Sequence, residues 1–106
     1  MPKLYFASPR DLPSEKPQAG IVRRTMRGER TTVWILDLAA RTVLETHKHD
    51  EEHLGVVMKG IVAMVIAGEQ RILTMGDTYV VPAGAAHGTR VLVSDSQVVD
   101  VAAGRP

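Results

Sequence analysis

The chain has 106 residues, 44% of them hydrophobic, which is enough for one hydrophobic core and too little for two. Lys and Arg (13) nearly balance Asp and Glu (12), and no basic stripe is interleaved with aromatic side chains, so we expect no nucleic-acid partner. The absence of cysteine excludes disulfides and thiolate metal sites within the chain.

Prolines divide residues 1–19, which predicts an irregular N-terminal arm rather than a helix. Leu4, Tyr5 and Phe6 could still add a short strand to this fold or to a partner. The segment lacks the apolar core of a signal peptide, and no apolar run in the chain approaches the ~18 residues that span a bilayer. We therefore expect a cytoplasmic protein without a membrane partner, with one domain over residues 20–106.

From residue 20 onward, short apolar or alternating runs are separated by turn sequences. Valine, isoleucine and threonine dominate these runs, which favours strands, and no segment keeps a helical period over three turns. Many short strands at close spacing predict an all-β barrel or sandwich. The expected strands are, in chain order, residues 21–26, 31–39, 43–49, 54–59, 61–67, 70–73, 78–81, 87–93 and 97–101.

The four histidines of the chain fall in two short segments: His47, His49 and His53 share one run, and His87 follows a Pro/Gly-containing turn. Because His47 and His49 are two residues apart, their side chains project from the same face of a β-strand. Imidazole is a common ligand of mid-to-late first-row metals. The sequence therefore predicts a metal site with four histidine ligands.

The spacing of these residues resembles the two motifs of the cupin superfamily. The first segment reads H-x-H-x3-H-x6-G from His47 to Gly60, where cupins have H-x-H-x3–4-E-x6-G. The second reads G-x5-P-x-G-x2-H from Gly76 to His87, where cupins add x3-N. The resemblance covers residues 20–101. It implies a cupin-type double-stranded β-helix, or jelly-roll barrel, and a homodimer.

The chain departs from the cupin motifs at three positions. His53 stands at the place of the usual glutamate ligand, Val91 replaces the final asparagine, and Arg41 replaces a glycine six residues before the first histidine. A one-residue bulge could instead deliver a carboxylate from Glu51 or Glu52 to the metal. The spacing selects His53.

The exchange of glutamate for histidine changes the charge of the site. Four neutral imidazoles leave a divalent metal at +2, whereas three imidazoles and a carboxylate leave +1. The four-histidine site should polarise a bound water or carbonyl more strongly and favour an anionic substrate. We expect one divalent transition metal per chain, namely manganese, iron, nickel, zinc or copper, and ligand type does not select among them.

Two carboxylates are predicted to be catalytic acid or base groups. On a regular strand Glu45 shares a face with His47 and His49, where it could also orient an imidazole. Asp100 lies in the apolar closing run, where a carboxylate costs free energy unless it is paired. The alternative for both is an exposed charge at the end or edge of a strand.

The closing segment, residues 98–105, resembles the last strand of small single-domain cupins. These include the pectin-degradation cupins that convert 4,5-unsaturated uronates to linear keto sugars. The resemblance implies that Asp100 belongs to the active site, and His47, His49 and His87 coincide with that family's metal ligands. Those cupins have glutamine near the position of His53, so the match is incomplete there.

The arginines carry a weaker signal. The densest basic patch, formed by Arg23, Arg24 and Arg27, is interpreted as a solvated strand face. Three other arginines are either exposed or placed to bind an anionic substrate at the barrel mouth. They are Arg41, Arg71 and Arg90.

The sequence favours a metal-dependent enzyme that acts on a small polar or anionic metabolite, with sugar-acid isomerase-like or lyase-like chemistry. A metal dioxygenase or oxidase with all-histidine ligation is the first alternative. A sugar-binding cupin without turnover is the second.

Overall fold

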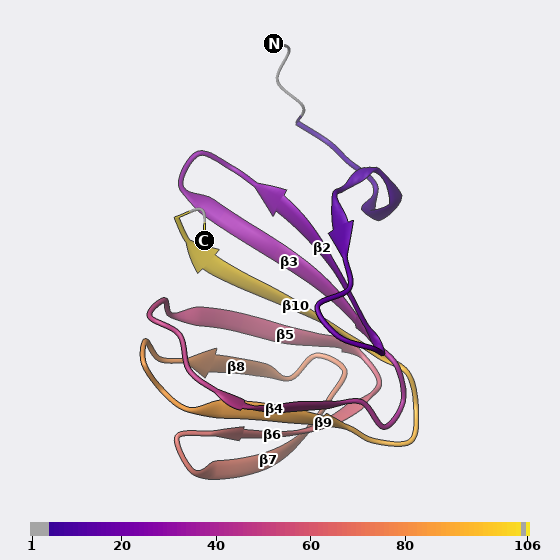
Figure 1. The fold of residues 1–106 in the computed structure, drawn as a ribbon, viewed down its shortest axis with the longest axis vertical. Helices are drawn as coiled ribbons and strands as arrows, with labels where there is room; N and C mark the ends of the chain where they lie inside the picture. The colour runs from indigo at the N-terminus through magenta and orange to yellow at the C-terminus, as the bar shows by residue number, and fades with distance from the viewer. Residues whose placement is uncertain (1–4, 105) are drawn as a thin grey trace.

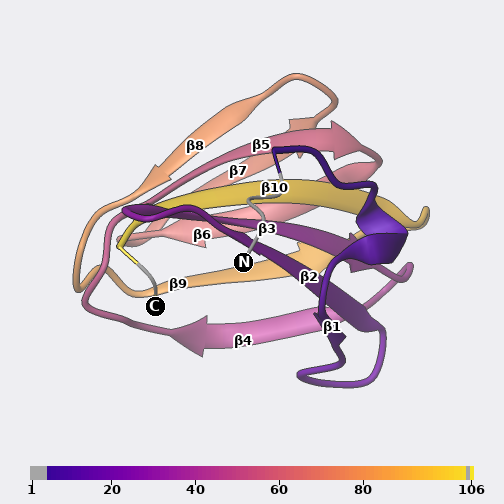
Figure 2. The ribbon, with the colours of Figure 1, turned by 90° about the horizontal axis from the view of Figure 1, so that it is seen from above.

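Ten strands form two antiparallel sheets in the computed structural model, which describes residues 5–104 and 106 (Figure 1). The strands are β1 (Ser14–Glu15), β2 (Ile21–Arg27), β3 (Thr31–Leu38), β4 (Val43–His47), β5 (His53–Lys59), β6 (Ile61–Ile66), β7 (Glu69–Thr74), β8 (Thr78–Val81), β9 (His87–Val91) and β10 (Ser96–Ala103). One sheet has the order β1-β2-β3-β10-β5-β8 and the other β4-β9-β6-β7. The edge strands β4 and β8 lie on opposite sides of the molecule in Figure 2. The predicted all-β jelly-roll fold is confirmed.

The segment expected to be an irregular arm contains two short regular elements. A 3-10 helix, η1 (Pro9–Asp11), precedes β1, whose residues Ser14 and Glu15 pair with β2. Tyr5 and Phe6 are exposed and lie outside any strand, and Leu4 lies outside the described residues. Within the described part of the chain, no helix is long and apolar enough to cross a membrane.

The hydrophobic core lies between the two sheets, because every second side chain of a strand points to the same face. Its members include Ile21 on β2, Val57 on β5 and Val91 on β9, all nearly inaccessible to solvent. Further along the same faces of β5 and β9 lie His53 and His87, each four residues away. His53 and His87 thus lie next to the hydrophobic core, at one end of the two sheets.

Gly60 closes the turn between β5 and β6 and is required there for two reasons. Its φ angle of +85° lies in the left-handed region that glycine tolerates best. A Cβ atom at this position would also overlap the side chain of Ser96. The glycine that ends the first histidine motif therefore shapes the turn and the packing beneath it.

Arg41 occupies a left-handed backbone position, with φ of +66°, while its N–H donates to the carbonyl of Leu92 (3.0 Å). A non-glycine residue in this conformation costs roughly 1–2 kcal/mol, more than the entropy that glycine loses on folding. We expect Arg41→Gly to raise the free energy of unfolding by about 0.5–1 kcal/mol, measured by urea denaturation. Gly60→Ala should lower it in the same assay. A less stable Arg41→Gly variant would contradict this account.

Candidate metal centre

The four histidines converge from both sheets and from the connection between them. His47 ends β4 and pairs across strands with His87, the first residue of β9. His53 begins β5 in the other sheet, and His49 lies in the connection between β4 and β5. β4 is two residues shorter than expected because residues 48–52 leave the sheet to cross between the layers.

The ligand atoms form two overlapping groups of three residues. One group is His47, His49 and His87, and the other is His49, Glu51 and His53; within each group the ligand atoms lie within 4.8 Å of one another. The His49 ring centroid lies 4.2 Å from that of His53 and 4.6 Å from that of His87. His49 thus belongs to both groups, and Glu51 adds a carboxylate beside the imidazoles.

Three of the imidazoles share one anchoring arrangement, in which Nδ1 contacts the backbone carbonyl of a residue two positions away. The pairs are His47 with Glu45 (2.9 Å), His49 with Glu51 (3.1 Å) and His87 with Ala85 (2.9 Å). Because a carbonyl oxygen only accepts, each Nδ1 must carry the proton and donate. Each Nε2 is therefore left with the lone pair that binds a metal.

The environment of His87 favours its neutral form. Burial lowers the pKa of His87, and the neighbouring His47, His49 and His53 lower it further, whereas the Ala85 carbonyl acts in the opposite direction. An imidazole ligand must be deprotonated at the nitrogen that binds metal. The surroundings therefore keep His87 in the form in which it can act as a ligand.

His53 is held differently from the other three histidines. Its ring stacks on Trp34, with centroids 5.0 Å apart and an interplanar angle of 26°. Its Nδ1 lies 3.9 Å from Oδ2 of Asp100, and its Nε2 is buried without a hydrogen-bond partner. A buried polar atom without a partner costs free energy that a bound ligand can remove. The donor set therefore fits a metal ion.

The partly buried carboxylate of Asp100 has a hydrogen-bond partner, the hydroxyl of Tyr79. The hydroxyl of Tyr79 donates to Oδ1 of Asp100, and the Asp100 side chain is 21% exposed. Burial raises the pKa of Tyr79, and the charge of Asp100 together with their hydrogen bond raises it further. Tyr79 thus remains a protonated donor.

The structure separates Glu45 from the histidines it was expected to accompany. A bulge between Leu44 and His47 shifts the register of β4 against β9, so residues 43–49 do not form the regular strand on which the placement of Glu45 depended. Leu44 and His47 line the histidine cavity, whereas Glu45 lines a separate hollow beside Thr46. Glu45 meets the site through its carbonyl oxygen, which accepts from His47.

A cavity of about 330 Å³ opens beside the histidines, and Trp34, Tyr79 and Asp100 also line it. Arg23 and Arg27 line it as well, because they lie on the same face of β2 as the buried Ile21 and Thr25. This shared face was the sequence signal that could have identified them. Arg41, Arg71 and Arg90 are absent from this lining.

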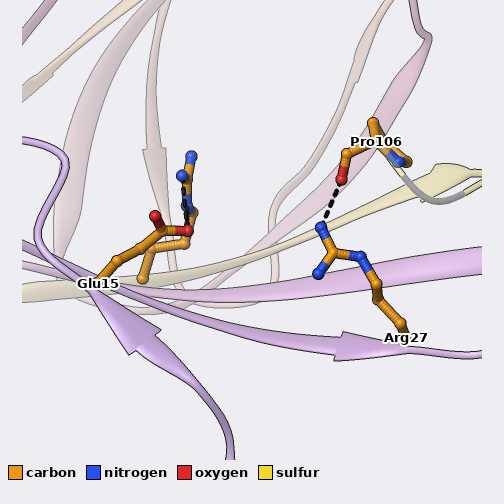
Figure 3. A network of polar contacts seen from close by, with 4 residues as sticks. Glu15, Arg27 and Pro106 are labelled. Atoms are coloured by element: carbon orange, nitrogen blue, oxygen red, sulfur yellow. Dashed lines mark hydrogen bonds and ion pairs between the residues drawn. The ribbon is translucent and has the colours of Figure 1, made fainter.

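The two cavity arginines have different partners. Arg23 donates through Nε (3.1 Å) and Nη2 (2.8 Å) to Oε1 of Glu15. Arg27 donates through Nη2 to the carbonyl of Pro106 (2.7 Å), as Figure 3 shows. Arg23 is thus balanced by a carboxylate, whereas no side-chain carboxylate forms an ion pair with Arg27 among residues 5–104.

The family model described as "Cupin domain" matches residues 34–104, which include all four histidines. The chain belongs to the cupin family. The structure of KdgF from Halomonas sp. is similar, with a TM-score of 0.89 at 24% identity, covering 98% of this chain and 96% of that one. A search of curated proteins gave no match to the chain.

Two further solved structures share the cupin fold. An RmlC-like cupin from Shewanella frigidimarina aligns with a TM-score of 0.88 at 17% identity, covering 97% of this chain and 93% of that one. Oxalate decarboxylase from Bacillus subtilis aligns with a TM-score of 0.80 at 19% identity. That alignment covers 92% of this chain but 29% of the decarboxylase, so this cupin corresponds to part of the longer enzyme.

Proposed function

We propose that this cupin is a metal-dependent enzyme that acts on a small anionic metabolite. One divalent transition metal is held by four imidazoles, those of His47, His49, His53 and His87. The observation that carries the proposal is the buried, unpartnered Nε2 of His53 in the same ligand group as His49, which also belongs to the group of His47 and His87. Glu51 is the alternative fourth ligand, since its carboxylate lies in the same group as His49 and His53.

The substrate class follows from the charges around the cavity. Four neutral imidazoles leave a bound divalent metal at +2, and Arg27 adds a guanidinium that can bind a carboxylate through two hydrogen bonds. When bound, the metal would supply a Lewis acid that polarises a substrate carbonyl. Oxalate decarboxylase, which shares this fold, is named for a small carboxylate substrate.

Asp100 is the group that we assign to proton transfer. Its carboxylate lines the cavity and accepts a hydrogen bond from Tyr79, so it is held where it could take a proton from a bound substrate. Removal of a proton beside a carbonyl is the step that sugar-acid isomerases and lyases share. Glu45 is a weaker candidate because its side chain lines another hollow. The predicted homodimer stays a prediction.

The all-imidazole donor set favours a second function, a dioxygenase or oxidase, because such ligation suits iron and copper. The dioxygenase or oxidase hypothesis requires a redox-active metal and the consumption of oxygen. The isomerase or lyase hypothesis requires neither.

Elemental analysis of the purified full chain tests the proposal. We expect about one transition metal per chain, since the residues form one centre. We further expect consumption of an unsaturated uronate without oxygen uptake, measured by absorbance and with an oxygen electrode. Oxygen uptake with iron or copper would favour the dioxygenase. Protein that remains metal-free after reconstitution with each candidate metal would contradict the catalytic proposal and leave a binding cupin.

A further inference from the structure

Three residues on neighbouring strands lie in one row across the six-stranded sheet. Asp100 on β10 pairs with Gly55 on β5, and Gly55 pairs in turn with Tyr79 on β8. The side chains of directly paired residues project from the same face of a sheet. Tyr79 and Asp100 are therefore two strands apart, with Gly55 between them, yet the tyrosine hydroxyl reaches the carboxylate.

This contact is possible because position 55 has no side chain. A Cβ atom at Gly55 would overlap the ring and the hydroxyl of Tyr79. The φ angle of Gly55 is not positive, so its backbone conformation does not itself require glycine. The role of this glycine is to leave the inner face of β5 open, so that the Tyr79 ring can lie across it.

The contact fixes the direction of the Asp100 carboxylate. Its Oδ1 accepts from Tyr79, and its Oδ2 is the oxygen that faces Nδ1 of His53 at 3.9 Å. That distance exceeds the ~3.2 Å limit of an N–H···O hydrogen bond, but it is within ion-pair range. An aspartate free to rotate would not present Oδ2 to the imidazole in this way.

His53 needs such a partner more than the other histidines do. The other three imidazoles are each anchored at Nδ1 by a backbone carbonyl two residues away. For His53, the structure gives an acidic side chain in place of that carbonyl. A carboxylate at Nδ1 holds the proton there, leaves Nε2 as the ligand atom and makes the imidazole a stronger donor.

We propose that Tyr79 is a positioning residue for the metal ligand His53, acting through Asp100 across the gap left by Gly55. This inference rests on the proposed metal function, and it assigns to two residues outside the histidine motifs a role in setting metal affinity. Tyr79 lines the same cavity but acts on the ligand through the carboxylate rather than by direct contact.

Two variants of the full chain test the proposal. Tyr79→Phe keeps the ring over Gly55 and removes the hydroxyl, and Gly55→Ala displaces the ring. We expect each to weaken Zn²⁺ binding about tenfold, measured by competition with a chelator, because partners of metal ligands typically contribute 10–100-fold. The double variant should lose little more than either single variant, since both break one contact. Tyr5→Phe is the matched control, because Tyr5 is 80% exposed and should change nothing.

A second readout follows the imidazole itself. Nitrogen-15 NMR of the zinc-loaded protein should show His53 protonated at Nδ1 in the parent and altered in Tyr79→Phe, with the other three histidines unchanged. Equal zinc affinity and an unchanged His53 signal in Tyr79→Phe would overturn the inference while leaving the metal function intact. If the parent binds no metal, the proposed function fails, and the inference that rests on it fails with it.

Discussion

Replacement of His49 by alanine is expected to abolish metal binding, and to do so more completely than replacement of any other histidine. His49 is the member shared by both groups of ligand residues, so its loss leaves neither group complete. His47→Ala leaves His49, Glu51 and His53 together, and His53→Ala leaves the group that contains His87. We expect His49→Ala to weaken Zn²⁺ binding more than about a hundredfold, beyond the range found for partners of ligands.

The measurement is zinc content per chain after equilibrium dialysis, together with chelator competition for the variants that retain metal. The adjacent glutamates supply a matched comparison. Glu51→Gln should weaken binding only if its carboxylate is a ligand, whereas Glu52→Gln should have no effect because Glu52 is exposed and outside both groups. Retention of one zinc per chain by His49→Ala would show that the ion does not bind between the two groups.

The strands and the histidine cluster were predictable because their signals are local. A short run of β-branched and aromatic residues favours a strand, as at residues 78–81, where prediction and structure coincide. The spacing from His47 to His53 likewise needs only the near neighbours. The strand pattern and the histidine spacing each lie within one segment of the chain, so predicting them does not require knowing how the strands pair.

The features that were missed depend on register between distant segments. Tyr79 meets Asp100 because both flank Gly55, a relation set by the pairing of three strands and not by the spacing of these residues in the chain. Glu45 was misplaced because a bulge changes which side chains of β4 face inward, and no residue type there indicates it. The place of Arg27 beside the cavity was predictable, because Arg27 is two residues from the buried Thr25 on the same strand face. Its charge instead led to the prediction of a solvated position.

Replacement of Arg27 by glutamine is expected to weaken the binding of small carboxylates by about tenfold or more. The Arg27 guanidinium lines the cavity, where it can donate hydrogen bonds to a ligand carboxylate. Hydrogen bonds to charged groups contribute about 1.5–3 kcal/mol, which corresponds to a tenfold or larger change in affinity. Arg23→Gln should have a smaller effect, because Glu15 already balances that charge.

Calorimetric titration of the zinc-loaded protein with galacturonate and with oxalate measures this difference. Arg24→Gln is the matched control, because Arg24 lies on the opposite face of β2 and pairs with Asp37 at 2.5 Å. Equal losses in Arg24→Gln and Arg27→Gln would mean that the ligand responds to net charge rather than to a cavity contact. Unchanged affinity in Arg27→Gln would argue against an anionic substrate held at β2. A loss confined to the two cavity arginines, and larger at Arg27, would locate the substrate carboxylate between this strand and the histidines.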